Sequence, residues 1–415
     1  MAPSRADLVA LAERALDHAG GDAQATAWWE RQHSSGPAGA VTSEAVSVEV
    51  AVVRDGRVGL ATTTDVDASG LARAAAGAAR LAPRGPEAAG ELPEGSPGRP
   101  HDGYDAGAAA LDPAQVDLDE WSNWRAAAAR TAIASSRGVR AYEERSFAEL
   151  RVRRHGEPGR SLELSATVVS PNDLDSQALG AEADRLLGGG EERVASVEAG
   201  EYAAVLGPWA VAEVLRRVAL SFGGPWSPLS DRLGTRVAAS AINLSDSPRF
   251  AATLPRSYDA EGSPRQPLPL IQDGVAHRVA GAGTGHAQGA AGVGGTLPEH
   301  LVLVGGGATD VSELAAPVER GLFIPSLSLH GAWTVGRRGA ALAEGVRLIR
   351  NGEPAAPAPN LTVLFEPLEL LARVQALSAR QRTIPPPLQR SARTASAIVA
   401  PAARVAGGVF VAGPA

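Results

Sequence analysis

Residues 205–225, VLGPWAVAEVLRRVALSFGGP, read as one helix whose two ends are marked in the sequence. Gly207-Pro208 opens the helix, because proline suits a first helical position, and Gly223-Gly224-Pro225 closes it. Glu213 and Arg217 lie four residues apart, where they can form an ion pair. The opposite face is apolar and consists of residues at helical spacing: Val211, Val214, Leu215, Val218, Ala219 and Phe222.

Three polar residues of this helix, Arg216, Arg217 and Ser221, occupy positions from which a helix can present groups to a cleft. The chain around them has 415 residues, enough for two or three domains, and its content of 44% hydrophobic and 20% charged residues is ordinary for a globular protein. The question is whether these three residues take part in a catalytic or binding site.

Charge and hydropathy narrow the classes of partner. The net charge is −7 and the basic residues are scattered, so we expect neither nucleic acid nor a membrane surface as a partner. No apolar run approaches the ~18 residues that a membrane span needs. The N-terminal helix expected from Ser4 contains acidic residues and no continuous apolar core, unlike a secretory signal. We therefore expect a soluble, cytoplasmic protein.

Two residue types are missing altogether. The chain has no cysteine, which excludes disulfides, thiolate nucleophiles and zinc–thiolate sites. It has no lysine, so all 39 basic residues are arginine, which excludes a phosphate loop ending in Gly-Lys, a lysine Schiff base and a Ser-Lys dyad. Neither a His-Glu-x-x-His motif nor a Gly-x-Ser-x-Gly elbow occurs.

The first 190 residues predict an α+β domain. Alternating valines on either side of Asp55-Gly56 predict a hairpin over 46–64. Residues 82–113 are rich in proline and glycine and predict a mobile surface loop or linker. Gly188-Gly189-Gly190 is the expected domain boundary. The remaining elements expected in this domain are a helix from Ser4, helices at 67–81, 117–134 and 171–187, and strands at 138–155 and 161–170.

Residues 191–415 predict a mainly β domain. After the quoted helix come many short apolar runs separated by glycine and proline, with hairpin turns at Asp273-Gly274 and Asn351-Gly352. One further helix is expected near 364–381. The fold class is therefore α+β, with a helix-hairpin-helix region, a second helix-and-strand segment, and a β-rich C-terminal domain.

Asp259 and Glu261 are candidate site residues, because two carboxylates at i, i+2 could share one face of a strand and act as acids, bases or acceptors. A solvated acidic turn is the alternative. The glycine-rich stretch 281–295 reads as a connection between strands, with a nucleotide cradle as the alternative. The loop histidines His277, His286 and His330 are isolated, and a lone loop histidine is more often a hydrogen-bonding residue than a ligand.

Several short segments, in order along nearly the whole chain, resemble the TldD/TldE (PmbA) metallopeptidase-related family. One of them, TGHAQG at 284–289, is similar to the Thr-Gly-His-Ala-Gly segment of the TldE branch, and SSRGV has Ser135 where the family has asparagine. The matching segments are RDGRVGLATTTDVD at 54–67, SSRGV at 135–139, YDAEG at 258–262, LIQDGV at 270–275, TGHAQG, RGLFI at 320–324, IRNGE at 349–353 and ASAIVAPAARVAGG at 395–408.

The resemblance gives the quoted helix a meaning. In the TldD branch the corresponding helix carries His-Glu-x-x-x-His, which holds a metal ion, and a cysteine downstream is associated with the site. Counted from Gly207-Pro208, those three places fall on Arg216, Arg217 and Ser221. Arginine has no free lone pair for a metal. The resemblance therefore implies a TldE-like chain that lacks the metal motif.

By the same resemblance, this chain is expected to be a non-catalytic subunit in proteolysis. It would contain no cofactor, and a TldD-like partner would supply zinc and cut a peptide substrate in a cytoplasmic oligomer, a heterodimer or larger. Asp259, Glu261, Gly285 and His286 match shared motifs and are expected to line the cleft. Arg216 and Arg217 could bind a carboxylate, although a plain Glu213–Arg217 surface pair is the simpler expectation.

Two other hypotheses stay open. One is a stand-alone hydrolase or tailoring enzyme with a rebuilt site, for which Asp259, Glu261, His277, His286 and His330 are the candidates. The other is a binding or assembly protein with no link to peptidases.

Overall fold

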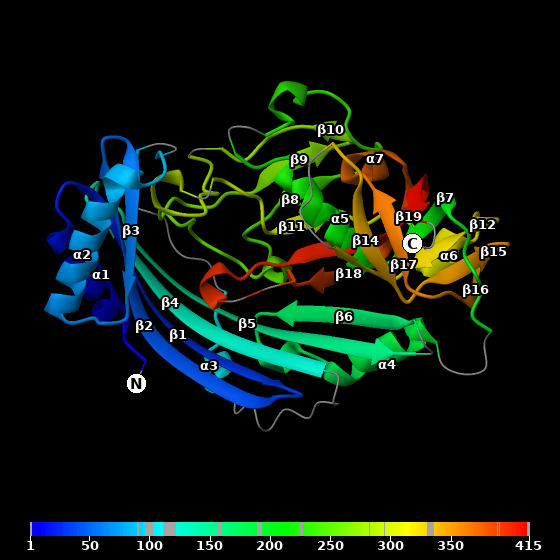
Figure 1. The fold of residues 1–415 in the computed structure, drawn as a ribbon, viewed down its shortest axis with the longest axis horizontal. Coiled ribbons are helices and arrows are strands. Elements are labelled where there is room, and N and C mark those ends of the chain that lie inside the picture. Colours follow the sequence, from blue (N-terminus) through cyan, green and yellow to red (C-terminus); the bar gives the residue numbers. More distant parts are fainter. Residues whose placement is uncertain are drawn as a thin grey trace.

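Two β-sheets with short helices around them make up the fold, which is α+β as predicted (Figure 1). One sheet has six strands and the other has thirteen. The computed structural model describes residues 2–88, 91–95, 103–110, 122–156, 159–188, 193–224, 227–281, 283–293, 295–329, 336–387, 389 and 391–412.

The six-stranded sheet is antiparallel throughout and has the order β3-β2-β1-β4-β5-β6. Its central strand β1 was not expected from the sequence. The predicted hairpin is confirmed, with Asp55 and Gly56 both at positive φ in the turn between β2 and β3. The strands are β1 (Asp22–Gly36), β2 (Gly39–Arg54), β3 (Arg57–Thr63), β4 (Ser122–Ser135), β5 (Arg140–His155) and β6 (Ser161–Val168).

The helices expected from Ser4 and at 67–81 are confirmed as α1 (Arg5–Ala19) and α2 (Ala68–Leu81), which pack on one face of this sheet. Ser4 caps α1 through a reciprocal capping box with Asp7, and Asp67 caps α2. The predicted loop of 82–113 contains a short 3-10 helix (Ala82–Arg84) and α3 (Gly107–Ala110); the rest of its length lies partly outside the described residues.

The helix expected at 117–134 is wrong, because residues 122–134 belong to strand β4. Its run of alanines is buried on both faces of the sheet. Ala128 and Ala132 pack in the cluster of α1 and α2, whereas Ala127 and Ala129 face the C-terminal half. Small side chains let both layers approach the strand closely, and this tertiary packing overrides the helical preference of alanine.

The thirteen-stranded sheet is mixed, with β11 parallel to β19 and β12 parallel to β7. The predicted turns at 273–274 and 351–352 are confirmed between β9 and β10 and between β15 and β16. The strands are β7 (Gly200–Leu206), β8 (Leu244–Asp246), β9 (Leu268–Gln272), β10 (Val275–Ala276), β11 (Leu301–Leu303), β12 (Arg320–Ile324), β13 (Ser326–Leu329), β14 (Gly339–Glu344), β15 (Arg347–Arg350), β16 (Glu353–Pro357), β17 (Leu361–Phe365), β18 (Val374–Ile384) and β19 (Ile398–Val411).

The helix expected at 364–381 is largely wrong. Only α7 (Pro367–Ala372) is helical, and the chain continues as β18, which pairs with β19. Pairing with a long buried strand outweighs the helical spacing of the leucines. The other helices are α4 (Ser176–Leu187), α5 (Pro208–Leu220), α6 (Val311–Ala315) and the 3-10 helices Pro171–Asp173, Ser230–Arg232, Ala251–Thr253, Ala290–Gly292 and Ala392–Thr394.

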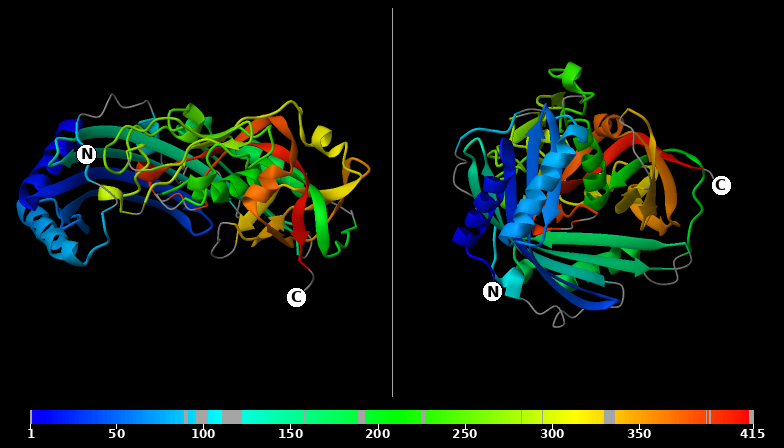
Figure 2. Two further views of the ribbon diagram at one scale, coloured as in Figure 1. Left: turned by 90° about the horizontal axis from the view of Figure 1, so that it is seen from above. Right: turned by 60° about the vertical axis from the view of Figure 1, so that its left-hand side comes forward.

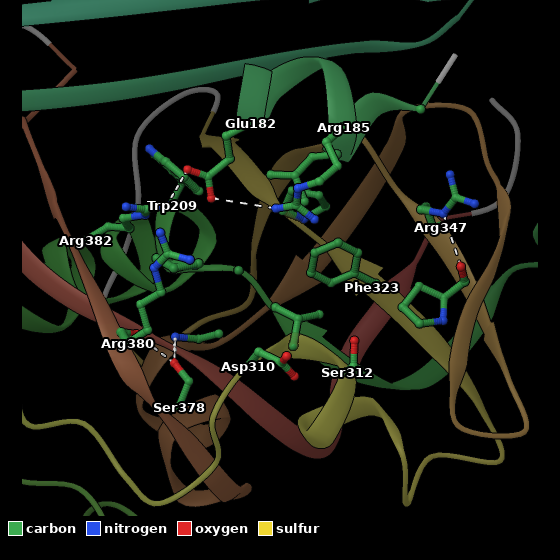
Figure 3. Close-up of a pocket in the computed structure, with 18 residues that line it drawn as sticks. Glu182, Arg185, Trp209, Asp310, Ser312, Phe323, Arg347, Ser378, Arg380 and Arg382 are labelled. Atoms are coloured by element: carbon green, nitrogen blue, oxygen red, sulfur yellow. Dashed lines mark hydrogen bonds and ion pairs between the residues drawn. The ribbon is translucent and has the colours of Figure 1, made fainter. Parts of the chain in front are cut away.

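The largest hydrophobic cluster joins the C-terminal half to the far end of the six-stranded sheet. It contains Leu150 of β5, Leu164 of β6 and Leu187 of α4 together with α5 and the second sheet. A cavity of about 610 Å³ opens where α4, α5, α6 and β18 meet (Figure 3). Among the helices in the described part of the chain, none has the length and apolarity to cross a membrane.

A single buried arginine ties the six-stranded sheet to the C-terminal half, which lies against its other face (Figures 1 and 2). Arg145 of β5 is 3% exposed and donates five hydrogen bonds, all to carbonyl oxygens of the C-terminal half. Burial lowers its pKa to about 10, so the guanidinium stays charged at neutral pH. The acceptors are Leu254 at 2.7 Å, Pro255 at 2.9 Å, Ala392 at 2.9 Å, Arg393 at 2.8 Å and Ala395 at 2.6 Å.

We predict that Arg145→Met lowers the free energy of unfolding by about 3 kcal/mol or more, because it leaves buried carbonyl groups without a donor. Denaturant unfolding measures the loss. Arg153→Met on the same strand is the control, since that side chain is 42% exposed and pairs with Glu163 at the surface. The control should lose less than about 1 kcal/mol. Equal losses in the two variants would contradict the stabilising role of the five Arg145 hydrogen bonds.

Candidate functional site

Helix α5 carries a cluster of charges that contains two of the three positions singled out by the sequence, Arg216 and Arg217, together with Glu213. Glu213 accepts a hydrogen bond from Arg216 and lies 3.5 Å from the Arg217 guanidinium. The Glu213 side chain is 7% exposed, so the expected surface pair is instead a buried triad. Burial raises the pKa of Glu213, and the two guanidiniums oppose that shift. The carboxylate is thus held by two cations.

The other contacts of these positions are structural. Arg216 also donates to the carbonyl oxygen of Pro385, 3.4 Å away, at the end of β18. Ser221 is the C-cap of α5 and is buried, and its carbonyl oxygen accepts a hydrogen bond from Ser227. Neither guanidinium has a lone pair to offer, so these residues do not fit a metal ion. Within the described residues, no group of three or more His, Asp, Glu or Cys side chains is arranged to hold one.

Asp259 organises a turn, and it is not paired with Glu261 on a strand. Its Oδ1 accepts hydrogen bonds from the backbone N–H of Glu261 at 3.0 Å and of Ser263 at 2.9 Å, and its Oδ2 accepts one from Ala287 N–H at 3.1 Å. The side chain is 3% exposed, which also corrects the alternative of a solvated turn. Burial raises the pKa of Asp259, and the three N–H groups oppose the rise. The carboxylate thereby joins the two sequence segments that contain Asp259 and His286.

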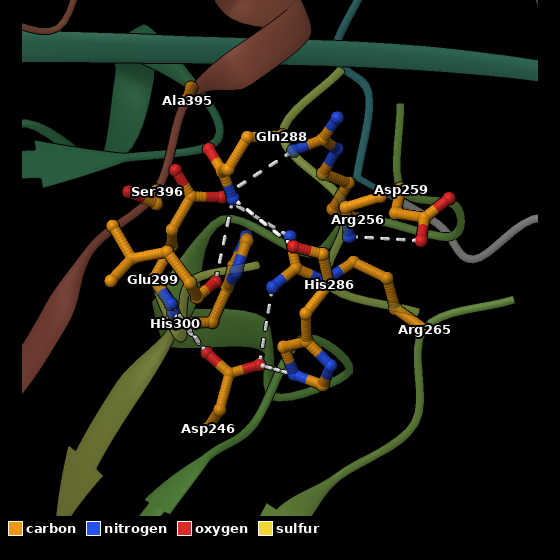
Figure 4. A network of polar contacts seen from close by, with 12 residues as sticks. Asp246, Arg256, Asp259, Arg265, His286, Gln288, Glu299, His300, Ala395 and Ser396 are labelled. Carbon is orange, nitrogen blue, oxygen red and sulfur yellow. Dashed lines mark hydrogen bonds and ion pairs between the residues drawn. The ribbon is translucent and has the colours of Figure 1, made fainter. Parts of the chain in front are cut away.

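His286 belongs to a buried network centred on Asp246 (Figure 4). Its Nε2 lies 2.8 Å from the Asp246 carboxylate, and its Nδ1 lies 2.8 Å from the carbonyl oxygen of Thr284. Asp246 also accepts hydrogen bonds from the backbone N–H of Glu299 at 2.8 Å and of His300 at 2.6 Å. The Asp246 carboxylate is therefore surrounded by donors from two further loops.

Arg265 completes the charge balance of this network. It is fully buried and lies 3.3 Å from both Asp246 and Glu299. Burial alone would raise the pKa of Asp246, but the Arg265 guanidinium and the His286 hydrogen bond outweigh it and hold the pKa far below its usual value. Glu299 lies 3.5 Å from Arg256 as well. The network is a set of compensated charges inside the core.

The sequence does not predict the roles of Asp246, Arg265 and Glu299. Asp246 sits at the end of a three-residue strand, and no spacing relates it to position 286 forty residues away. His300 is also buried in this region, and neither of its ring nitrogens has a partner within the described residues. A lone aspartate and a lone arginine in a Gly- and Pro-rich stretch give no local signal.

The remaining candidates are scattered. A cavity of about 220 Å³ beside the six-stranded sheet is lined by Asp259 and Gln288, and by Glu143, Arg256 and Tyr258. Glu261, Gly285 and His286 are not among its lining residues. His277 is exposed next to β10. His330 lies outside the described residues, so its predicted role is not addressed by the structure.

The position of Gly285 demands a glycine, and we predict that Gly285→Ala destabilises the fold strongly. Its φ is +75°, and an added Cβ would lie 2.4 Å from the Pro264 carbonyl oxygen. Gly283→Ala is a matched control, because Gly283 has a φ of +74° and open space around it. The Gly285 variant should lose about 2 kcal/mol more than the control in chemical unfolding. Equal losses would mean that only the backbone conformation matters.

We predict that the free energy of unfolding of Asp246→Asn falls less steeply with decreasing pH than that of the wild-type protein. Because the pKa of Asp246 is depressed in the folded state, its contribution is present above the unfolded pKa of about 4 and is lost as the pH falls below it. At pH 7 the variant should be about 3 kcal/mol less stable, because Arg265 and His286 lose a buried partner. Asp231→Asn, at an exposed position, is the control. A variant with the wild-type acid slope would contradict the assignment.

A family model matches part of this chain, and other proteins of known structure share its fold. The PmbA/TldA metallopeptidase C-terminal domain matches residues 199–412. No match was found among curated proteins. Among solved structures, TldE from Thermococcus kodakarensis is 18% identical with a TM-score of 0.78, covering 98% of this chain and 99% of its own.

Two further solved structures have the same fold, and each is described as a putative modulator of DNA gyrase. The protein from Thermotoga maritima is 18% identical with a TM-score of 0.77, covering 94% of this chain and 95% of its own. The protein from Bacteroides thetaiotaomicron is 19% identical with a TM-score of 0.75, covering 98% of each chain. With the family domain matching more than half of its length, the chain belongs to the TldD/TldE (PmbA) family of metallopeptidase-related proteins.

Proposed function

We propose that this chain is a TldE-like subunit, without catalysis of its own, of a cytoplasmic metallopeptidase complex that acts on peptides. A TldD-like partner would hold the zinc ion and cut the substrate. The observation that carries the proposal is the triad of Glu213, Arg216 and Arg217 on α5. At the places where the resemblance puts two ligands and a general base, this chain has a serine and two arginines.

The charged side chains of α5 are already paired with one another. A metal-bound water needs ligands with free lone pairs and a carboxylate free to take its proton. Arginine supplies no lone pair. The only carboxylate of α5, Glu213, is held by two guanidiniums, so it is poorly placed to act as a base. The helix is therefore suited to a structural role in the complex.

A stand-alone hydrolase finds less support. Both carboxylate oxygens of Asp259 accept hydrogen bonds from backbone N–H groups. Both ring nitrogens of His286 are hydrogen-bonded, one to Asp246 and one to Thr284. A general acid or base needs an open position toward a substrate. His277 is exposed next to β10 and is not among the hydrogen-bond partners of either residue.

The proposal predicts the behaviour of the purified chain alone and with a partner. Alone, after a purification without histidine tags, it should contain less than about 0.1 metal ion per chain and cleave no peptide. Co-expressed with a TldD-like chain from the same genome, it should co-purify with that chain and raise its peptidase activity about tenfold or more. Elemental analysis and a fluorogenic peptide assay measure both effects.

Variants of the triad separate a subunit from an enzyme. Arg216→Gln and Arg217→Gln should leave the activity of the complex within about twofold, because neither residue contributes a chemical step. A loss of about a hundredfold in a folded, assembled complex would contradict the proposal. Stoichiometric zinc in the chain alone, or failure to bind any TldD-like chain, would contradict it as well.

A further inference from the structure

The cavity between α4, α5 and β18 gathers positive charge in a protein that is acidic overall. Four arginines but only two carboxylates line it, an excess of two positive charges, although the whole chain carries −7 (Figure 3). The arginines are Arg185 of α4, Arg347 of β15, and Arg380 and Arg382 of β18. Since three separate elements supply them, the excess is a property of the cavity and not of one charged strand.

The two lining carboxylates balance only part of this charge. Glu182 is shared, with Arg382 at 2.5 Å and Arg185 at 3.9 Å. Asp310 instead caps α6 by accepting a hydrogen bond from the backbone N–H of Glu313. The guanidinium of Arg380 makes no ion pair or hydrogen bond with any described residue and is exposed at the mouth. A cleft with a surplus of one charge attracts ligands of the opposite charge.

The floor of the cavity is apolar and rigid. Phe323 is 4% exposed and Trp209 is 6% exposed, and the indole N–H of Trp209 donates to the carbonyl oxygen of Ser165 at 2.7 Å, which fixes the ring. A volume of about 610 Å³ falls in the range of small-ligand sites. The cavity therefore matches a ligand that joins an oxyanion to an apolar group.

We propose that this cavity binds the free carboxylate end of a short peptide, with Arg380 and Arg185 holding the carboxylate and the last side chain packing on Phe323 and Trp209. Guanidinium groups bind carboxylates through paired, charge-assisted hydrogen bonds. The choice of a peptide over a phosphate rests on the proposed function. The cavity would then retain a substrate or a product of the complex by its C-terminus.

Isothermal titration of the purified full-length chain tests this. The probes are acetyl-Ala-Ala-Phe as the free acid, the same peptide as its C-terminal amide, and inorganic phosphate. We expect the free acid to bind about tenfold or more tightly than the amide, and phosphate to compete only weakly. The double variant Arg185→Gln/Arg380→Gln should lose about tenfold in affinity for the free acid and none for the amide.

Arg320→Gln is the control, because Arg320 lies on the same strand as Phe323 but is 69% exposed and pairs with Glu198 outside the cavity. It should leave the affinity unchanged. Equal binding of acid and amide, tighter binding of phosphate than of peptide, no binding at millimolar peptide, or an unaltered double variant would each overturn the proposal. The titration needs no partner subunit. If the chain binds the peptide but does not assemble with any TldD-like chain, the proposed function is contradicted and this inference is not.

Discussion

The five hydrogen bonds of Arg145 are the constraint on which the arrangement of the two halves depends. They reach from β5, next to the edge strand β6 of the six-stranded sheet, to two separate loops, one after β8 and one before β19. A guanidinium has five N–H donors in a fixed plane, and here each of its three nitrogens finds a carbonyl oxygen. A lysine could not reproduce this pattern, because its ammonium is a compact group with three donors. In a chain whose basic residues are all arginine, this chemistry recurs: Arg125 and Arg151 bind the carbonyls of Gln389 and Pro386 in the same connection between β18 and β19.

That connection explains the position of α5. Arg216 donates to the carbonyl oxygen of Pro385, so the helix is tied to the same connection that the sheet holds through Arg145 and Arg151. The place where the resemblance expects a metal ligand is thus part of the contact between the two sheets. Arginine at this place makes a structural hydrogen bond and supplies a partner for the buried Glu213.

Local chemistry made part of the fold predictable. Local signals specify these conformations within four residues: the Ser4 helix cap, Gly207-Pro208 at the start of α5, and the Asp-Gly and Asn-Gly turns. The alanine run of β4 and the leucines before β18 were misread because their state depends on the layers that cover them. The site was predictable only in part. The motif residues Asp259 and His286 were found, but their saturation by backbone groups and by Asp246 depends on loops far apart in the sequence.

The regions of this molecule differ in whether their charged groups have hydrogen-bond and ion-pair partners within the chain. Around Asp246 and around Glu213, each carboxylate has cationic or N–H partners, and such fully compensated groups stabilise one arrangement and offer nothing to a ligand. The cavity beside α4 is different, because its carboxylates are committed to Arg382 and to the cap of α6 while a guanidinium remains at its mouth. The guanidinium of Arg380 lines the same cavity as Phe323 and Trp209 and has no ion pair or hydrogen bond with a described residue. An oxyanion supplied from outside the chain is what would balance it.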